Sequence, residues 1–132
     1  MRLALGTVQF GLAYGISNSA GEVPDDELDT ILALARQLGV DTLDTAQAYG
    51  NAESRLGSRP TADFRLVNKL APGIRPPEVN ACVQSSLQRL GRTRLDGLLL
   101  HRSQDASPAL FEALATLQQE GKVGKTGVSV YA

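Results

Sequence analysis

The chain has 132 residues, 42% of them hydrophobic, and its 13 basic and 14 acidic residues leave a net charge of −1. This composition is typical of one soluble globular unit, and the lack of a basic stripe with interleaved aromatic residues argues against nucleic acid as a partner. No apolar segment approaches the roughly 18 residues of a membrane span. Because Met1 to Leu5 is also too short for the apolar part of a signal peptide, we expect no membrane partner and a cytoplasmic location.

Short apolar segments alternate with amphipathic helical patterns along the chain, which is typical of repeated β-α-β units. The shortness and apolar character of these segments suit a parallel sheet that is covered on both faces. The predicted strands are Leu3 to Leu5, Thr42 to Leu43, Leu66 to Val67, Gly97 to Leu100 and Thr126 to Val128.

Four helices are predicted between the strands, and most of them have clear start and stop signals. The first has an acidic first turn, an apolar face made by Leu28, Ile31, Leu32, Ala35 and Leu38, and Gly39 as its stop. The fourth has Ser107 as N-cap and Pro108 in its first turn. The predicted ranges are Asp26 to Leu38, Asn51 to Gly57, Pro76 to Gly91, and Ser107 to the stop at Gly121.

The single cysteine and the single histidine exclude two kinds of site. Cys82 has no partner for an internal disulfide and shares a helical face with Val79, Val83, Leu87 and Leu90, so we predict a small buried apolar residue. Cys82 and His101 have no suitably spaced ligands beside them. We therefore predict no metal site.

Two architectures fit this order of elements, an open doubly wound sheet and part of a (β/α)8 barrel. A doubly wound nucleotide-binding domain would carry GxGxxG after its first strand, but Gly6, Gly11 and Gly15 have spacings of five and four. Gly124-Lys125-Thr126 lacks the earlier glycine of a phosphate loop, since Gln119 stands there. Both nucleotide motifs are thus rejected, and both architectures stay open.

Four polar residues follow successive predicted strands: Asp44 and Tyr49 the second, Lys69 the third and His101 the fourth. In a parallel barrel those strand ends open on one face, where the four side chains would converge. An ammonium lowers the pKa of a nearby phenol by favouring the phenolate, and a carboxylate can hold the ammonium in place. With His101 positioning a carbonyl oxygen beside the phenol, such a group could protonate that oxygen while a hydride reaches its carbon.

Each of these residues also has an ordinary structural explanation when it is considered alone. Asp44 with Thr45 could cap a turn, Tyr49 could pack on a neighbouring loop, Lys69 could be an exposed loop lysine, and His101 could be a structural residue. The four placements together favour the functional interpretation.

Several motifs resemble those of the aldo-keto reductase family, and together they extend over essentially the whole chain. The longest is DTAQAYGNAESRLG, from Asp44 to Gly57. The others are Leu5 to Gly11, Val67-Asn68-Lys69, LDGLLLHR from Leu95 to Arg102, and Gly121 to Ser129. The resemblance implies a partial (β/α)8 TIM barrel of about five strands and four helices, and NADPH-dependent reduction of an aldehyde or ketone to an alcohol.

The resemblance also implies roles for individual residues. Tyr49 would be the general acid, Lys69 would make it more acidic, Asp44 would orient Lys69, and His101 would bind a small carbonyl substrate. Gly6, Thr7, Asp44 and Ser129 would lie at the NADPH site. The chain departs from the family at Val130, where an asparagine often follows the serine of the fifth strand and holds the carboxamide.

The family barrel has eight strands, so we interpret residues 1–132 as a single N-terminal portion that is truncated after the fifth strand. Such a fragment would have little activity alone, and its open sheet edges would favour a homo-oligomer. The alternative is a half-barrel that works as a non-catalytic binding or interaction module with a remnant of the four residues.

Overall fold

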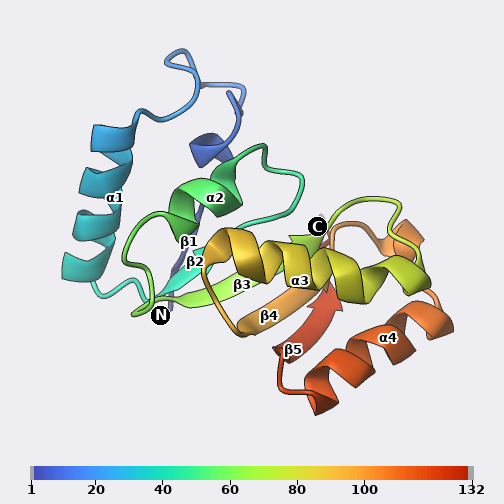
Figure 1. Cartoon of the computed structure of the whole chain (residues 1–132). Helices are drawn as coiled ribbons and strands as arrows, with labels where there is room; N and C mark the ends of the chain where they lie inside the picture. Colours follow the sequence, from blue (N-terminus) through green and yellow to red (C-terminus); the bar gives the residue numbers. More distant parts are fainter. Residues whose placement is uncertain (1, 131–132) are drawn as a thin grey trace.

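The computed structural model describes residues 2–130; Met1 and residues 131–132, the two ends of the predicted unit, lie outside the described residues. Five parallel strands form one sheet in the order β1-β2-β3-β4-β5. Figure 1 shows them side by side, from blue β1 to red β5. Their bounds are β1 Ala4–Gly6, β2 Thr42–Asp44, β3 Arg65–Leu70, β4 Leu95–Leu100 and β5 Val123–Val128.

One α-helix separates each pair of consecutive strands, and α2 and α3 lie in front of the sheet in Figure 1. A doubly wound sheet reverses its strand order at a switch point, whereas this order follows the chain throughout. The order is that of a (β/α)8 barrel wall, here an open sheet within the described residues. The helices are α1 Asp25–Gln37, α2 Ala52–Gly57, α3 Val79–Leu90 and α4 Pro108–Gln119, with short 3₁₀ turns at Val8–Phe10, Pro76–Glu78 and Ser103–Asp105.

The predicted start and stop signals act as expected at most helix ends. The Ser107 hydroxyl accepts a hydrogen bond from the Leu110 N–H at 3.1 Å, which caps α4. Gly91 ends α3 in the left-handed conformation, with φ of 63°. Gly57 ends α2 for another reason: a Cβ there would lie 1.8 Å from the Arg89 carbonyl oxygen, so the glycine lets α2 approach α3 closely.

The core lies between the sheet and its helices. The side chains of Leu43, Leu66 and Leu98 point to this layer and are fully buried. Three predicted core residues differ. Leu38 is 71% exposed because it follows the last turn of α1. Ile31 is only partly buried, and so is Cys82, which lies at the edge of the apolar face of α3. Burial still raises the pKa of the Cys82 thiol, which keeps it protonated at neutral pH.

The other face of the sheet is open, so the expectation of a sheet covered on both faces is wrong for the described residues. Ala4, Gly6, Arg65 and Lys125 are exposed. A hollow of about 520 Å³ crosses this face and includes only two large apolar side chains, Val67 and Leu99, both partly buried. Most of the residues that line this hollow are therefore polar. None of the described helices is long and apolar enough to cross a membrane.

Candidate active site

The carboxyl ends of β2, β3 and β4 bring together residues that lie far apart in the sequence. Asp44 is the last residue of β2, Lys69 is the second-to-last residue of β3, and His101 directly follows β4. The second and third predicted strands, Thr42 to Leu43 and Leu66 to Val67, were too short, because Asp44 and Lys69 still pair with residues of the neighbouring strands. Tyr49 comes from the turn that leads into α2.

The ammonium of Lys69 is the centre of this cluster. Lys69 is only 6% exposed. Its Nζ donates hydrogen bonds to Oδ1 of Asp44, to the carbonyl oxygen of Thr45 at 3.1 Å and to the hydroxyl oxygen of Tyr49 at 3.4 Å. An ammonium has three protons and no acceptor. All three protons thus have a partner, which fixes the lysine side chain in place.

The ring of Tyr49 lies close to both Lys69 and His101. The Lys69 Nζ is 5.2 Å from the centre of the Tyr49 ring, and the Tyr49 and His101 rings meet edge to face with centres 6.0 Å apart. Because the phenol oxygen accepts from Lys69, its own proton is available for another acceptor. The arrangement thus presents an O–H donor beside an imidazole.

His101 lies in an environment that favours the neutral imidazole. Burial lowers the pKa of His101, and the positive charge of Lys69 lowers it further, while Asp105 and Asp44 oppose the shift. Nδ1 of His101 is buried and makes no hydrogen bond among residues 2–130. A neutral imidazole has one donor and one acceptor nitrogen, so it can hydrogen-bond a polar ligand without adding a charge.

Two glycines set the position of the tyrosine turn against the loop that follows β1. A Cβ on Gly11 would lie 1.7 Å from the Tyr49 carbonyl oxygen, and a Cβ on Gly50 would lie 2.3 Å from the Gly11 carbonyl oxygen. Gly50 also has a φ of +54°, which disfavours other residues. Gly11 does not belong to a nucleotide-binding motif. Its lack of a side chain instead allows the tyrosine turn to pack closely on the loop after β1.

Two further polar residues, Gln47 and Glu53, which no sequence motif marked as functional, hold the Tyr49 segment in place. The side-chain oxygen of Gln47 accepts from the Ala71 N–H at 2.7 Å, and its amide nitrogen donates to the Ser86 hydroxyl at 2.9 Å. Glu53 is buried, with 3% exposure, although it lies on a surface helix. Its spacing of four residues from Gly57 is a signal that could have placed it on the α3 side of α2.

The predicted cofactor residues lie at the same edge of the sheet. Apart from Gly6 and its two chain neighbours, no residue has an atom within 4 Å of a Cβ placed on Gly6, so the space beside Asp44 is open. The Thr7 hydroxyl is buried and donates to the Asp44 carbonyl oxygen at 3.0 Å. The Ser129 N–H donates to the Leu100 carbonyl oxygen at 2.9 Å, which places Ser129 beside the end of β4.

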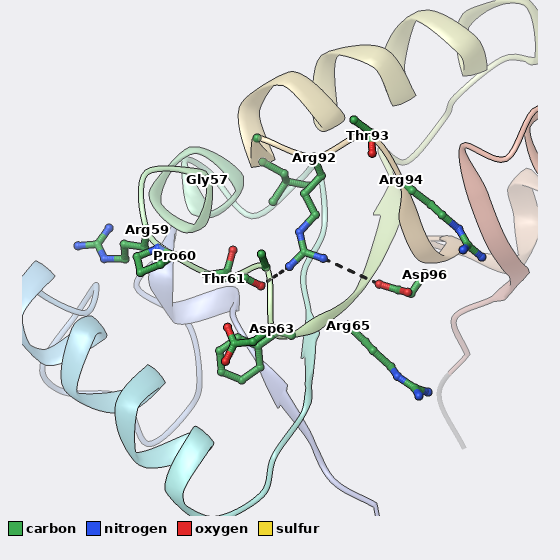
Figure 2. Close-up of a pocket in the computed structure, with 14 residues that line it drawn as sticks. Gly57, Arg59, Pro60, Thr61, Asp63, Arg65, Arg92, Thr93, Arg94 and Asp96 are labelled. Atoms are coloured by element: carbon green, nitrogen blue, oxygen red, sulfur yellow. Dashed lines mark hydrogen bonds and ion pairs between the residues drawn. The ribbon is translucent and has the colours of Figure 1, made fainter.

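A second hollow, of about 560 Å³, lies at the opposite ends of the strands (Figure 2). Its lining includes Arg65, the first residue of β3, and Asp96 near the start of β4. Arg92 crosses it and donates to the Thr61 carbonyl oxygen, and it lies 3.9 Å from the Asp96 carboxylate. These contacts connect structural elements and include none of the four predicted catalytic residues. Within residues 2–130 there is also no group of three or more side chains suited to hold a metal ion.

Comparison with known proteins shows which family the chain is similar to. The model of the Aldo/keto reductase family matches residues 2–132. Aflatoxin B1 aldehyde reductase member 2 of Rattus norvegicus is 31% identical over 97% of this chain and 36% of its own length.

Solved structures show the same relationship. A putative aldo-keto reductase from Pseudomonas aeruginosa is 33% identical, with a TM-score of 0.83 over 96% of this chain and 54% of its own. An aldo-keto reductase of Bombyx mori, solved in complex with NADP, shares the fold at 22% identity and a TM-score of 0.72, over 96% of this chain and 45% of its own. The chain thus spans about a third to a half of these proteins. It belongs to the aldo/keto reductase family, and its open five-stranded sheet corresponds to the N-terminal part of that family's (β/α)8 barrel.

Proposed function

We propose that Asp44, Tyr49, Lys69 and His101 are the catalytic residues of an NADPH-dependent reductase that converts an aldehyde or ketone to an alcohol. The observation that carries the proposal is the set of three acceptors around the Lys69 ammonium: the Asp44 carboxylate, the Thr45 carbonyl and the Tyr49 hydroxyl. This set supports a protonated lysine that is fixed beside a phenol. It is the arrangement needed for a tyrosine that acts as an acid.

Bound NADPH would supply the hydride to the carbonyl carbon. Tyr49 would give its proton to the carbonyl oxygen, which becomes the hydroxyl of the product, and the remaining phenolate would be stabilised by the Lys69 ammonium. Asp44 would hold the lysine side chain in place by accepting its hydrogen bond. The neutral imidazole of His101 would hydrogen-bond the carbonyl oxygen and hold it next to Tyr49.

The open space at the strand ends supports the proposed cofactor site. The open space above Gly6 would accept a flat ring beside Asp44, and Ser129 would border the same space. The hydrogen bond from Thr7 to the Asp44 backbone suggests that Thr7 fixes Asp44 in that site. Val130 is exposed, and its side chain has no amide group, so it would not hold the carboxamide of the cofactor as an asparagine would.

The test uses two proteins. The first is the 132-residue chain, titrated with NADPH while the fluorescence of the nicotinamide is followed. The second is a graft in which residues 2–130 replace the corresponding segment of the Pseudomonas aeruginosa relative, assayed for NADPH oxidation with a reactive aldehyde. We expect turnover by the graft. A folded graft that binds NADPH without reducing any aldehyde would contradict the proposal and favour the non-catalytic binding module.

A further inference from the structure

Glu53 is a buried carboxylate between the two parts of the chain that carry Tyr49 and Lys69. Its Oε2 accepts a hydrogen bond from Nδ2 of Asn68 at 2.8 Å, and its Oε1 accepts from Nε of Arg89 at 2.9 Å. A buried carboxylate needs a charged partner and hydrogen bonds to be tolerated, and Glu53 has both. The same side chain therefore connects α2 with β3 and α3.

The close approach of α2 to α3 makes the ion pair of Glu53 and Arg89 possible. Gly57 lies four residues after Glu53 and contacts the backbone of Arg89, where any side chain would collide. Residues four apart share a face of a helix. Glu53 and Gly57 thus lie on the face of α2 that contacts α3. Gly57 has no side chain to keep the two helices apart, and Glu53 adds a hydrogen bond to a charged residue of α3.

Asn68 extends this connection to the residue next to it, Lys69. Asn68 is fully buried, and its Oδ1 accepts the backbone N–H of Lys69 at 2.8 Å while its Nδ2 donates to Glu53. Along a strand, neighbouring side chains point to opposite faces. Asn68 therefore points to the helices, and Lys69 points to Tyr49 on the open side.

We propose that Glu53, paired with Arg89, is a positioning residue that fixes the distance between the Tyr49 hydroxyl and the Lys69 ammonium. Tyr49 lies in the turn directly before α2, and Lys69 adjoins Asn68 in β3, so the hydrogen bond between Glu53 and Asn68 connects the two catalytic segments. This role rests on the proposed function, because the distance matters for catalysis only where Tyr49 and Lys69 are catalytic residues. A misplacement of about 1 Å in such a site can cost about 10²-fold in rate.

The test measures how close the Lys69 side chain lies to the Tyr49 ring in the 132-residue chain. The chain has only three lysines, Lys69, Lys122 and Lys125, and three tyrosines, so selective labelling of these two residue types gives a simple NMR spectrum even for an associated form. We expect a nuclear Overhauser cross-peak between the Lys69 side chain and the Tyr49 ring. In Glu53→Gln this cross-peak should be lost while other long-range cross-peaks of the sheet persist.

Arg89 offers a second variant, because its side chain is 43% exposed and its removal leaves no buried gap. Arg89→Ala should weaken the cross-peak, and the conservative Arg89→Lys should restore it. Glu78→Gln is the matched control, since it breaks an exposed ion pair with Arg75 at the start of α3, and it should leave the cross-peak unchanged.

A cross-peak of wild-type strength in folded Glu53→Gln or folded Arg89→Ala would overturn the proposal. Global unfolding of Arg89→Ala would also overturn it, because the pair would then support the fold as a whole. In the graft, Glu53→Gln should lower kcat by about 10²-fold with the KM for NADPH unchanged. If the graft is inactive while the cross-peak responds as expected, the proposed function fails and the positioning geometry stands.

Discussion

The Lys69 ammonium lies 3.4 Å from the Tyr49 hydroxyl, although the two residues are twenty positions apart and belong to different elements. Lys69 belongs to β3, which pairs with a neighbouring strand on each of its edges. Tyr49 belongs to a turn that packs on the loop after β1. The chemistry of the site therefore depends on how accurately a turn is held against a sheet.

Replacement of Tyr49 by phenylalanine should remove the proton donor while it leaves the ring in place. In the active graft we expect Tyr49→Phe to lower kcat by about 10²- to 10⁴-fold, the usual contribution of a general acid, and to leave NADPH affinity nearly unchanged. Steady-state kinetics together with NADPH titration check both parts. A kcat close to that of the unchanged graft would show that another group supplies the proton.

Replacement of Lys69 by methionine should lower the rate of the graft. The ammonium stabilises the phenolate that is left after Tyr49 gives up its proton, and methionine carries no charge that could do so. We expect kcat to fall in the assay with a reactive aldehyde. Lys69→Arg should restore only part of the rate, because the planar guanidinium differs in shape and reach. A kcat of Lys69→Met equal to that of the unchanged graft would mean that the two residues are not coupled.

The stability of the chain should decrease as pH falls through the ordinary pKa of histidine. Because burial and Lys69 lower the pKa of His101 below its usual 6.5, the unfolded chain binds more protons than the native chain as the pH drops through this value. We expect the free energy of unfolding, measured with urea between about pH 8 and pH 5, to decline over the lower part of this range. His101 is the only histidine, so His101→Gln should abolish this decline. An equal slope in the variant would assign the effect to other groups.

Gly57→Ala should destabilise the fold because its Cβ would collide with the Arg89 carbonyl oxygen. Overpacking of this kind typically costs about 1–3 kcal/mol. Gly6→Ala is the matched control, since nothing lies within 4 Å of its Cβ and its φ is not positive, and it should not lower stability. Urea unfolding of both variants checks the pair of outcomes. Equal stabilities would show that α2 and α3 separate at little cost.

The 132-residue chain on its own should associate and show little or no NADPH-dependent turnover. Within the described residues, β1 and β5 each have one unpaired edge, and such edges favour pairing with another chain. Association through the open face is disfavoured, because Arg65, Arg94 and Lys125 line its hollow and form no ion pair within residues 2–130. Light scattering beside an NADPH oxidation assay checks both parts. A monomer of 14.0 kDa with turnover near the roughly 1 to 10³ per second of ordinary enzymes would contradict them.

The sequence by itself determined the parts of the fold that local interactions control. Ser107 caps α4 and Gly91 ends α3, because caps and left-handed glycines act within a few residues of their own position. The apolar segments also gave the correct number of strands and their approximate places in the chain. The strand bounds differed: in β2 and β3 the polar residues Asp44 and Asn68 pair within strands whose apolar pattern they interrupt, and β4 and β5 begin earlier than predicted, at Leu95 and Val123.

Only the tertiary structure decided which polar residues meet. The motif from Asp44 to Gly57 marked Tyr49, and its place after the third predicted strand marked Lys69, but their contact depends on strand register and on the path of a turn. Glu53 had the appearance of an ordinary residue on a short surface helix. Its burial between α2, β3 and α3 arises from contacts 15 and 36 positions away, and contacts at such separations follow from the packing of whole elements, which a local pattern does not encode.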